Sequence, residues 1–110
     1  MRLKYGNVRT YSTLCNRWFS SKLEATRGEQ LRLMEMAGEI SDLEYQISFK
    51  LCNKPKLTLT VDFGYSSKDR EHIILEDVKG YKETREFRVK RLWLKEKYGI
   101  EVKLIRKEDI

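Results

Sequence analysis

Hydrophobic and polar positions change their spacing along the chain, from a helical period near the start to strict alternation in the middle and back again. Gly38 and Gly99 follow the two helical stretches as stop signals, and Pro55 marks the turn between the first two alternating segments. The predicted elements are, in order, a helix, three strands, a helix and a strand, over residues 20–37, 43–51, 56–65, 71–78, 84–98 and 100–105. This αβββαβ order predicts a single α/β domain of the α+β kind that covers residues 1–110.

Two of the predicted strands end in charged residues. In the strand predicted over residues 56–65, one face carries Leu57, Leu59, Val61 and Phe63, and the other carries Thr58, Thr60 and Asp62. At the end of the strand predicted over residues 71–78, Asp77 and Lys79 share a face, whereas Glu76 points the opposite way and is expected to have a structural role. If the two strands pair, Asp62 can reach Asp77. This assignment depends on the alternation, because a one-residue slip would exchange Asp77 for Glu76.

Two carboxylates and a lysine at one end of a sheet favour a particular chemistry. Two nearby carboxylates repel each other unless a cation lies between them, and hard oxygen ligands suit Mg²⁺. Lys79 would add a fixed positive charge, which favours phosphodiester hydrolysis. The residues alone fit a simpler interpretation equally well, in which Asp62 caps a turn and Asp77 with Lys79 is a surface ion pair.

Charge is distributed unevenly along the chain. The 110 residues carry 23 basic and 17 acidic side chains, a net charge of +6, which favours a polyanionic partner. Residues 1–27 hold six basic side chains and one acid, residues 82–97 hold seven against three, and residues 28–81 hold seven against ten. Basic flanks around an acidic middle suit a nuclease, whose flanks bind phosphates while the acids hold a metal. Ordinary solvated helix faces would carry similar charges.

Asp62 followed by Asp77-Val78-Lys79 resembles the PD-(D/E)XK nuclease signature, with Val61 where the name of the motif has proline. The similarity covers roughly residues 4–106 and includes Phe19 to Ala25, Ala37 to Ile40, Leu43 to Gln46, Asp62 to Tyr65, Glu76 to Gly80 and Thr84 to Leu92. These segments resemble a phage and prophage family of small endonuclease-like proteins, similar to Holliday junction resolvases. Ile47 stands where that family has proline, and the loop between Leu51 and Leu57 is short for it.

The resemblance implies a restriction-endonuclease-like core, with a central mixed sheet flanked by helices, and an endonuclease that uses Mg²⁺ or Mn²⁺. It implies that Asp62, Asp77 and the Val78 carbonyl hold the metal, that Lys79 stabilises developing charge, and that Glu24 completes the site. The implied substrate is branched DNA, such as four-way junctions in phage recombination or replication. A transposon-end or mismatch endonuclease, a noncatalytic DNA-binding or packaging protein and a structural protein are the alternatives.

Glu24 also has a structural interpretation. Ser21 and Glu24 have the spacing of a capping box, in which the acid bonds the backbone of the N-cap residue. On a helical wheel Glu24 lies at the edge of the face that is predicted to be buried, so it can also lean toward the sheet. That face consists of Leu23, Leu31, Met34 and Ala37. The spacing favours the cap, whereas the resemblance favours the metal site.

Basic and amide side chains are the candidates for DNA contacts. They are Lys4, Arg9, Lys22, Gln46, Arg85, Arg88 and Arg91. We expect the basic ones to contact phosphates rather than bases. Gln46 is expected either near the metal or as a solvated amide.

The second predicted helix carries two apolar stripes on nearly opposite sides. They consist of Phe87, Leu94 and Tyr98, and of Val89, Leu92 and Trp93. One stripe can cover the sheet. The other favours a two-fold homodimer that presents two sites to a junction, unless the helix is sandwiched within one domain.

Several function classes are disfavoured by what the sequence lacks. No segment approaches the ~18 apolar residues needed to span a bilayer, and the N-terminus lacks the apolar run of a signal peptide. We therefore expect a cytoplasmic protein without membrane contact, in the host cell if it is phage-encoded. Cys15 and Cys52 have no metal-ligand spacing and His72 is the one histidine, which disfavours zinc and Cys/His catalysis. We expect both cysteines to be reduced.

Overall fold

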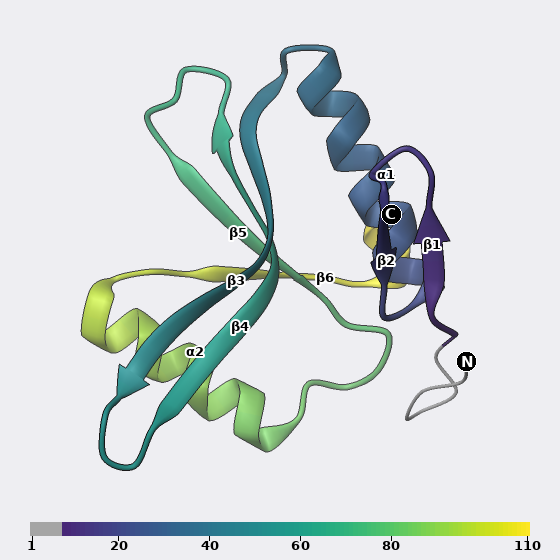
Figure 1. Ribbon diagram of the computed structural model, residues 1–110. Coiled ribbons are helices and arrows are strands. Elements are labelled where there is room, and N and C mark those ends of the chain that lie inside the picture. The colour runs from purple at the N-terminus through teal and green to yellow at the C-terminus, as the bar shows by residue number, and fades with distance from the viewer. Residues whose placement is uncertain (1–7) are drawn as a thin grey trace.

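The computed structural model describes residues 8–110 (Figure 1). Its elements are β1 (Thr10–Ser12), β2 (Arg17–Phe19), α1 (Lys22–Met36), β3 (Ile40–Cys52), β4 (Leu57–Ser67), β5 (Ile73–Val78), α2 (Arg85–Tyr98), β6 (Val102–Ile105) and a final 3₁₀ helix, Lys107–Asp109. From α1 to β6 the predicted order and the α+β class are confirmed. The hairpin of β1 and β2 was not predicted, because strands of three residues leave almost no alternation to detect.

The helix boundaries follow from their end residues. Ser21 is the N-cap of α1, and its hydroxyl accepts a hydrogen bond from the Glu24 N–H at 3.1 Å. Gly99 ends α2 in the left-handed conformation, with φ of 68°. Ala37 was predicted on the buried face of α1, but it is exposed because the helix ends at Met36 and Ala37 lies beyond its last turn. Neither helix is long and apolar enough to cross a membrane, as judged over residues 8–110.

The main sheet is mixed and has the strand order β3-β4-β5-β6. The first three strands pair antiparallel, and β6 pairs parallel to β5 after the crossover through α2. On β5, Leu75 packs in the cluster that contains Leu94 of α2, whereas the adjacent Glu76 bonds Arg27 of α1. Neighbouring residues of a strand point to opposite faces, so the two helices cover opposite faces of β5. This arrangement agrees with the predicted central mixed sheet flanked by helices.

The strands β3 and β4 form a long antiparallel ribbon (Figure 1). Its buried residues pass from one core cluster to the other near Asp62. Phe63 packs in the core cluster beside α1, whereas Val61 packs in the cluster beside α2. Gln46 lies across from Asp62 in the register and has a left-handed φ of 53°, which interrupts the pleat of β3. The predicted alternation over residues 57–63 is confirmed, since Leu59, Val61 and Phe63 are buried and Thr58 and Thr60 are exposed. The buried side chains are divided between the two core clusters, which the alternation did not predict.

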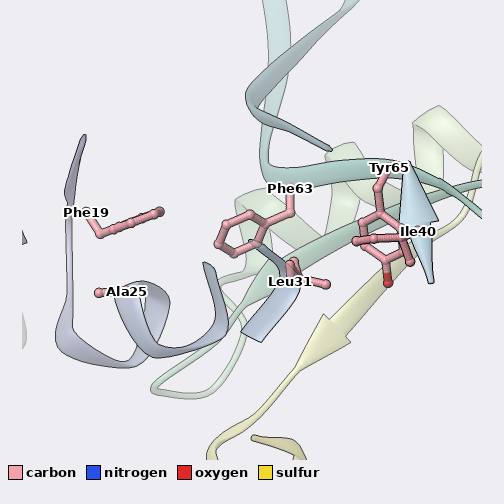
Figure 2. Packing of buried hydrophobic residues seen from close by; sticks show 6 residues of the cluster. All are labelled: Phe19, Ala25, Leu31, Ile40, Phe63 and Tyr65. Carbon is pink, nitrogen blue, oxygen red and sulfur yellow. The ribbon is translucent and has the colours of Figure 1, made fainter. Parts of the chain in front are cut away.

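The first core cluster joins the hairpin, α1 and the sheet (Figure 2). Its buried members are Phe19, Ala25, Leu31, Ile40, Phe63 and Tyr65. The rings of Phe19 and Phe63 lie 6.1 Å apart, centroid to centroid. Gly28 of α1 permits this packing, because a Cβ there would stand 2.7 Å from the Phe19 ring. The hairpin is thus held against the helix by its last residue.

The second cluster lies under α2, and it confirms one of the two predicted stripes. Leu94 is fully buried and Phe87 packs against the same cluster, although Tyr98 of that stripe is exposed. The outer face of α2, defined by Val89, Leu92 and Trp93, is 52%, 47% and 37% exposed. Within residues 8–110 nothing covers this outer face.

Candidate functional site: a carboxylate pair at a strand fork

The candidate site lies where β4 and β5 separate. Backbone pairing between the two strands ends at Phe63 and Glu76, and side chains then replace the backbone as partners. The Asp62 N–H donates to Asp77 Oδ1 at 3.1 Å, and the Val78 N–H donates to Asp62 Oδ2 at 2.8 Å. These two bonds fix both carboxylates in the fork. The predicted approach of Asp62 to Asp77 is confirmed.

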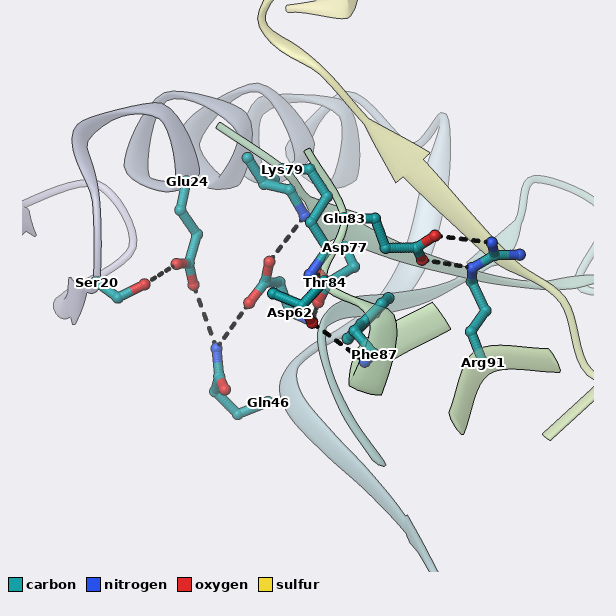
Figure 3. Close-up of polar contacts among 11 residues, drawn as sticks. Ser20, Glu24, Gln46, Asp62, Asp77, Lys79, Glu83, Thr84, Phe87 and Arg91 are labelled. Carbon is teal, nitrogen blue, oxygen red and sulfur yellow. Dashed lines mark hydrogen bonds and ion pairs between the residues drawn. The ribbon is translucent and has the colours of Figure 1, made fainter. Parts of the chain in front are cut away.

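Lys79 lies in the same fork. Its Nζ is 2.8 Å from Asp77 Oδ2 and 3.4 Å from the centroid of the Phe87 ring (Figure 3). The Asp77 side chain is 7% exposed, so this is a largely buried pair rather than the surface ion pair of the simpler interpretation. Glu76 points away from the fork and bonds Arg27, as expected from the strand alternation.

Glu24 reaches the site from the first turn of α1. Its carboxylate accepts hydrogen bonds from the Ser20 hydroxyl and, at 3.2 Å, from Gln46 Nε2, which also donates to Asp62 Oδ1 at 3.3 Å (Figure 3). The capping box is thus only half formed: Ser21 caps the Glu24 N–H, but the Glu24 carboxylate turns inward to other partners. Gln46 joins two acids beside the fork, as the first of its two predicted roles required, and it also remains exposed to solvent. Its left-handed backbone belongs to this constellation.

Burial raises the pKa of each of these acids. It raises the pKa of Asp77 to about 7, with the neighbouring charge of Asp62 adding to the effect and Lys79 opposing it. Burial and the charge of Glu24 raise the pKa of Asp62 to about 6. The pKa of Glu24 is also raised, chiefly by burial. One lysine therefore does not neutralise the negative charge in the fork, and an added cation would relieve it.

The acids and Lys79 open into a cleft of about 290 Å³. Its other walls come from the start of α1, from β4, and from the segment that leads into α2, and they include Ser20, Ser21, Leu23, Thr60, Val78, Gly80 and Phe87. A substrate in this cleft would approach both carboxylates and the lysine from one side.

The donor set suits a hard divalent cation. Each carboxylate oxygen of Asp62, Asp77 and Glu24 makes one polar contact described above, and a carboxylate oxygen has about two lone-pair sites, so each keeps room for a ligand. Oxygen donors of this kind favour Mg²⁺ or Mn²⁺. The three carboxylates do not all lie within 4.8 Å of one another. In the described part of the chain that spacing occurs at Asp69, Glu71 and His72, which are exposed.

The candidate DNA contacts divide into three groups. Arg9, Lys22, Arg85 and Arg88 are exposed. Gln46 belongs to the acid cluster. Arg91 is bonded to Glu83 by Nε at 2.7 Å and Nη2 at 3.0 Å, so it secures the segment before α2 instead of projecting freely. Lys4 lies outside the described residues.

Two residues near the site were missed from the sequence. Arg17 and Trp18 of β2 line a second cleft that adjoins the first one. The signal was present but short, since an asparagine that tolerates the left-handed turn, Asn16 with φ of 54°, precedes an Arg-Trp-Phe run.

Metal-free protein should lose stability relative to an Asp77→Asn variant as the pH rises. In the folded protein the pKa is about 6 for Asp62 and about 7 for Asp77, against an ordinary pKa of 3.8 for both carboxyl groups. A raised carboxyl pKa stabilises the folded state below the unfolded pKa, and this contribution is lost as the pH rises through the folded pKa. In urea unfolding with EDTA at pH 8, the variant should exceed the wild type by on the order of 2 kcal/mol. At pH 4 the two should agree.

Mg²⁺ should remove this difference at pH 8, because it would stabilise the wild type and not the variant that lacks a charged ligand. Titrating groups outside the fork are common to both proteins and cancel in the comparison. Equal stabilities of wild type and variant at both pH values would contradict the crowding of charge in the fork.

The fold and the site together define an α+β protein with a carboxylate pair and a lysine at a strand fork, in which Asp77 is buried and Asp62 is partly buried. Residues 2–107 match the family of proteins of unknown function DUF1064, and the chain belongs to that family. No curated protein and no solved structure matches it.

Proposed function

We propose that the protein is a metal-dependent DNA endonuclease that hydrolyses phosphodiester bonds in branched DNA, such as four-way junctions. The observation that carries the proposal is the meeting of Asp62 and Lys79 with the buried Asp77 at the fork, where the two acids have raised pKa values. Perturbed acids in a cleft are typical of catalytic sites. The resemblance to PD-(D/E)XK nucleases in the same three residues supports the same reaction.

Each side chain has a task in this proposal. Asp62 and Asp77, with the Val78 carbonyl, would hold Mg²⁺ or Mn²⁺, and Glu24 would complete the site through its place beside Gln46. A bound metal would polarise the phosphate and lower the pKa of a coordinated water. Lys79 would place a positive charge beside the phosphate oxygens, where negative charge grows during the reaction. The bonds from Asp62 and Val78 backbone N–H groups keep both carboxylates oriented.

The exposed basic residues fit a DNA partner. Arg85 and Arg88 lie in the first turn of α2, and Phe87 between them lines the cleft. Arg9 lies on the far side, at the hairpin. A DNA backbone crossing the fork would meet positive charge on both sides, and its binding would weaken steeply with salt. A cytoplasmic location, where such DNA is found, belongs to the proposal.

We also propose a two-fold homodimer through the outer face of α2. Three large apolar side chains together on a surface helix favour a protein contact, and a dimer would offer two sites to the paired strands of a junction. Sedimentation velocity at micromolar concentration should give a dimer for the wild type and a monomer for Leu92→Glu. A wild-type monomer would contradict this part of the proposal.

The nuclease proposal is tested by cleavage of end-labelled four-way, flap, nicked and linear DNA in Mg²⁺ or Mn²⁺. We expect cleavage near the branch, strongest on the four-way junction, and none in excess EDTA. Preference for a flap or for linear ends would point to another endonuclease. Steep salt-dependent binding without cleavage would indicate the noncatalytic DNA-binding protein. A protein that neither cleaves nor binds DNA would have a structural role instead.

A further inference from the structure

A second cleft adjoins the candidate metal centre. It has a volume of about 430 Å³ and shares Ser20, Glu24 and Asp62 with the first cleft. Its other wall is the hairpin of β1 and β2, which contributes Arg9, Arg17, Trp18 and Phe19. A ligand that fills both clefts would therefore lie across the acids, with one part in the fork and the next part against the hairpin.

The hairpin wall combines an exposed ring with two guanidinium groups. Trp18 is 51% exposed, and the Arg9 guanidinium lies 4.8 Å from its ring centroid. The Arg17 guanidinium lies 4.3 Å from the centroid of the Tyr45 ring. Neither arginine forms an ion pair with an acid among residues 8–110, so both charges remain for a ligand. Stacking on rings limits their motion, which lowers the entropic cost of binding an anion.

The hairpin is also firmly attached. Ser12 is buried and its hydroxyl donates to Glu29 of α1 at 2.6 Å, while Phe19 is buried in the first core cluster. Tyr11 meets Trp18 edge to face, with centroids 5.3 Å apart. Trp18 is thus an exposed ring on a fixed support. Such a ring can receive a planar group without much loss of freedom.

We propose that this second cleft binds the nucleotide next to the scissile phosphate, with its base stacked on Trp18 and its phosphate on Arg9 or Arg17. The proposal rests on the nuclease function and names the feature of the substrate that the site selects. A base within a continuous duplex is stacked between its neighbours and presents no face to a protein ring. A base at a branch, flap or mismatch is already unpaired or leaves its stack at low cost. The subsite would therefore favour DNA with a free base beside the cut.

The test is a coupling measurement between Trp18 and one base. Binding is measured by fluorescence anisotropy in an Asp77→Asn background, which removes cleavage from the assay, on four-way DNA with single abasic positions around the branch. We expect one abasic position to weaken binding about 10-fold, the scale of a base stacked on a protein ring. Trp18→Ala should weaken binding to intact DNA by a similar factor and should abolish the sensitivity to that abasic position. Trp18→Phe, which keeps a ring, should retain the sensitivity.

Charge gives an independent readout on the same complexes. Arg17→Gln should make the negative slope of log affinity against log salt concentration shallower by about 0.7, the value for one phosphate of a single strand. Trp18→Ala should leave that slope unchanged. The subsite is overturned if Trp18→Ala and the abasic change weaken binding by independent factors at every position, so that the combined effect is their product. This outcome would overturn the subsite even if the wild type cleaves DNA. If Trp18 and one base are coupled but the wild type never cleaves DNA, the subsite is supported and the nuclease function is contradicted.

Discussion

Asp77→Asn should reduce cleavage of branched DNA on the order of 10³-fold, because it removes a charged metal ligand and the partner of Lys79 from the site where transition-state charge is stabilised. DNA affinity should stay the same or increase, since the substitution removes a negative charge close to a polyanion. The fold should persist, because Asn can still accept the hydrogen bond from the Asp62 N–H. Initial rates under single-turnover conditions and anisotropy binding curves measure the two effects separately.

Asp69→Asn is the matched control for this variant. Asp69 is an exposed aspartate of the loop after β4, and its carboxylate accepts hydrogen bonds from the Ser67 hydroxyl and the Glu71 N–H. The same isosteric loss of charge there should leave cleavage unchanged. Equal cleavage by wild type and Asp77→Asn would refute the site assignment. Loss of DNA affinity in Asp77→Asn would contradict the electrostatic argument.

Glu76→Ala should destabilise the protein by about 3–5 kcal/mol, the usual effect of removing one partner from a buried ion pair. Glu76 is completely buried, and its two carboxylate oxygens accept hydrogen bonds from Arg27 Nε and Nη2, both at 2.8 Å. The Tyr65 hydroxyl donates to the same carboxylate. Without Glu76 the Arg27 charge would be left in the core with no acid to neutralise it. Urea unfolding followed by circular dichroism measures the change.

A surface pair provides the control for Glu76. Lys95 and Glu101 lie 2.7 Å apart, but their side chains are 56% and 72% exposed. Glu101→Ala should leave the unfolding midpoint nearly unchanged, because water already screens such pairs. A double variant, Arg27→Met with Glu76→Leu, should recover much of the loss, since the unpaired charge is gone. A small effect of Glu76→Ala would mean that Glu76 does not hold α1 against the sheet.

The sequence was sufficient for those features that depend on local periodicity. Asp77 and Glu76 are adjacent, yet one lies in the fork and the other in the core, as the alternation of β5 predicted. The glycine stop signals and the serine N-cap gave the helix limits within a few residues. Glu24 was placed at the edge of the buried face, and it is indeed buried at the site.

The remaining features depend on contacts between distant segments. Gln46 has a left-handed backbone where β3 passes the acids, and glutamine carries no sequence signal for that conformation. Arg91 was expected to face DNA, but Glu83, eight residues earlier, bonds it. The hairpin lies beside the acids because Phe19 fits over Gly28, a match of shapes that periodicity does not record.

Anomalous diffraction from crystals grown with Mn²⁺ tests the central claim most directly. We predict a manganese peak in the fork between the Asp62 and Asp77 carboxylates, and its loss in Asp77→Asn. A peak only at the exposed group of Asp69, Glu71 and His72, or no peak in the fork at saturating Mn²⁺, would contradict the proposed metal centre.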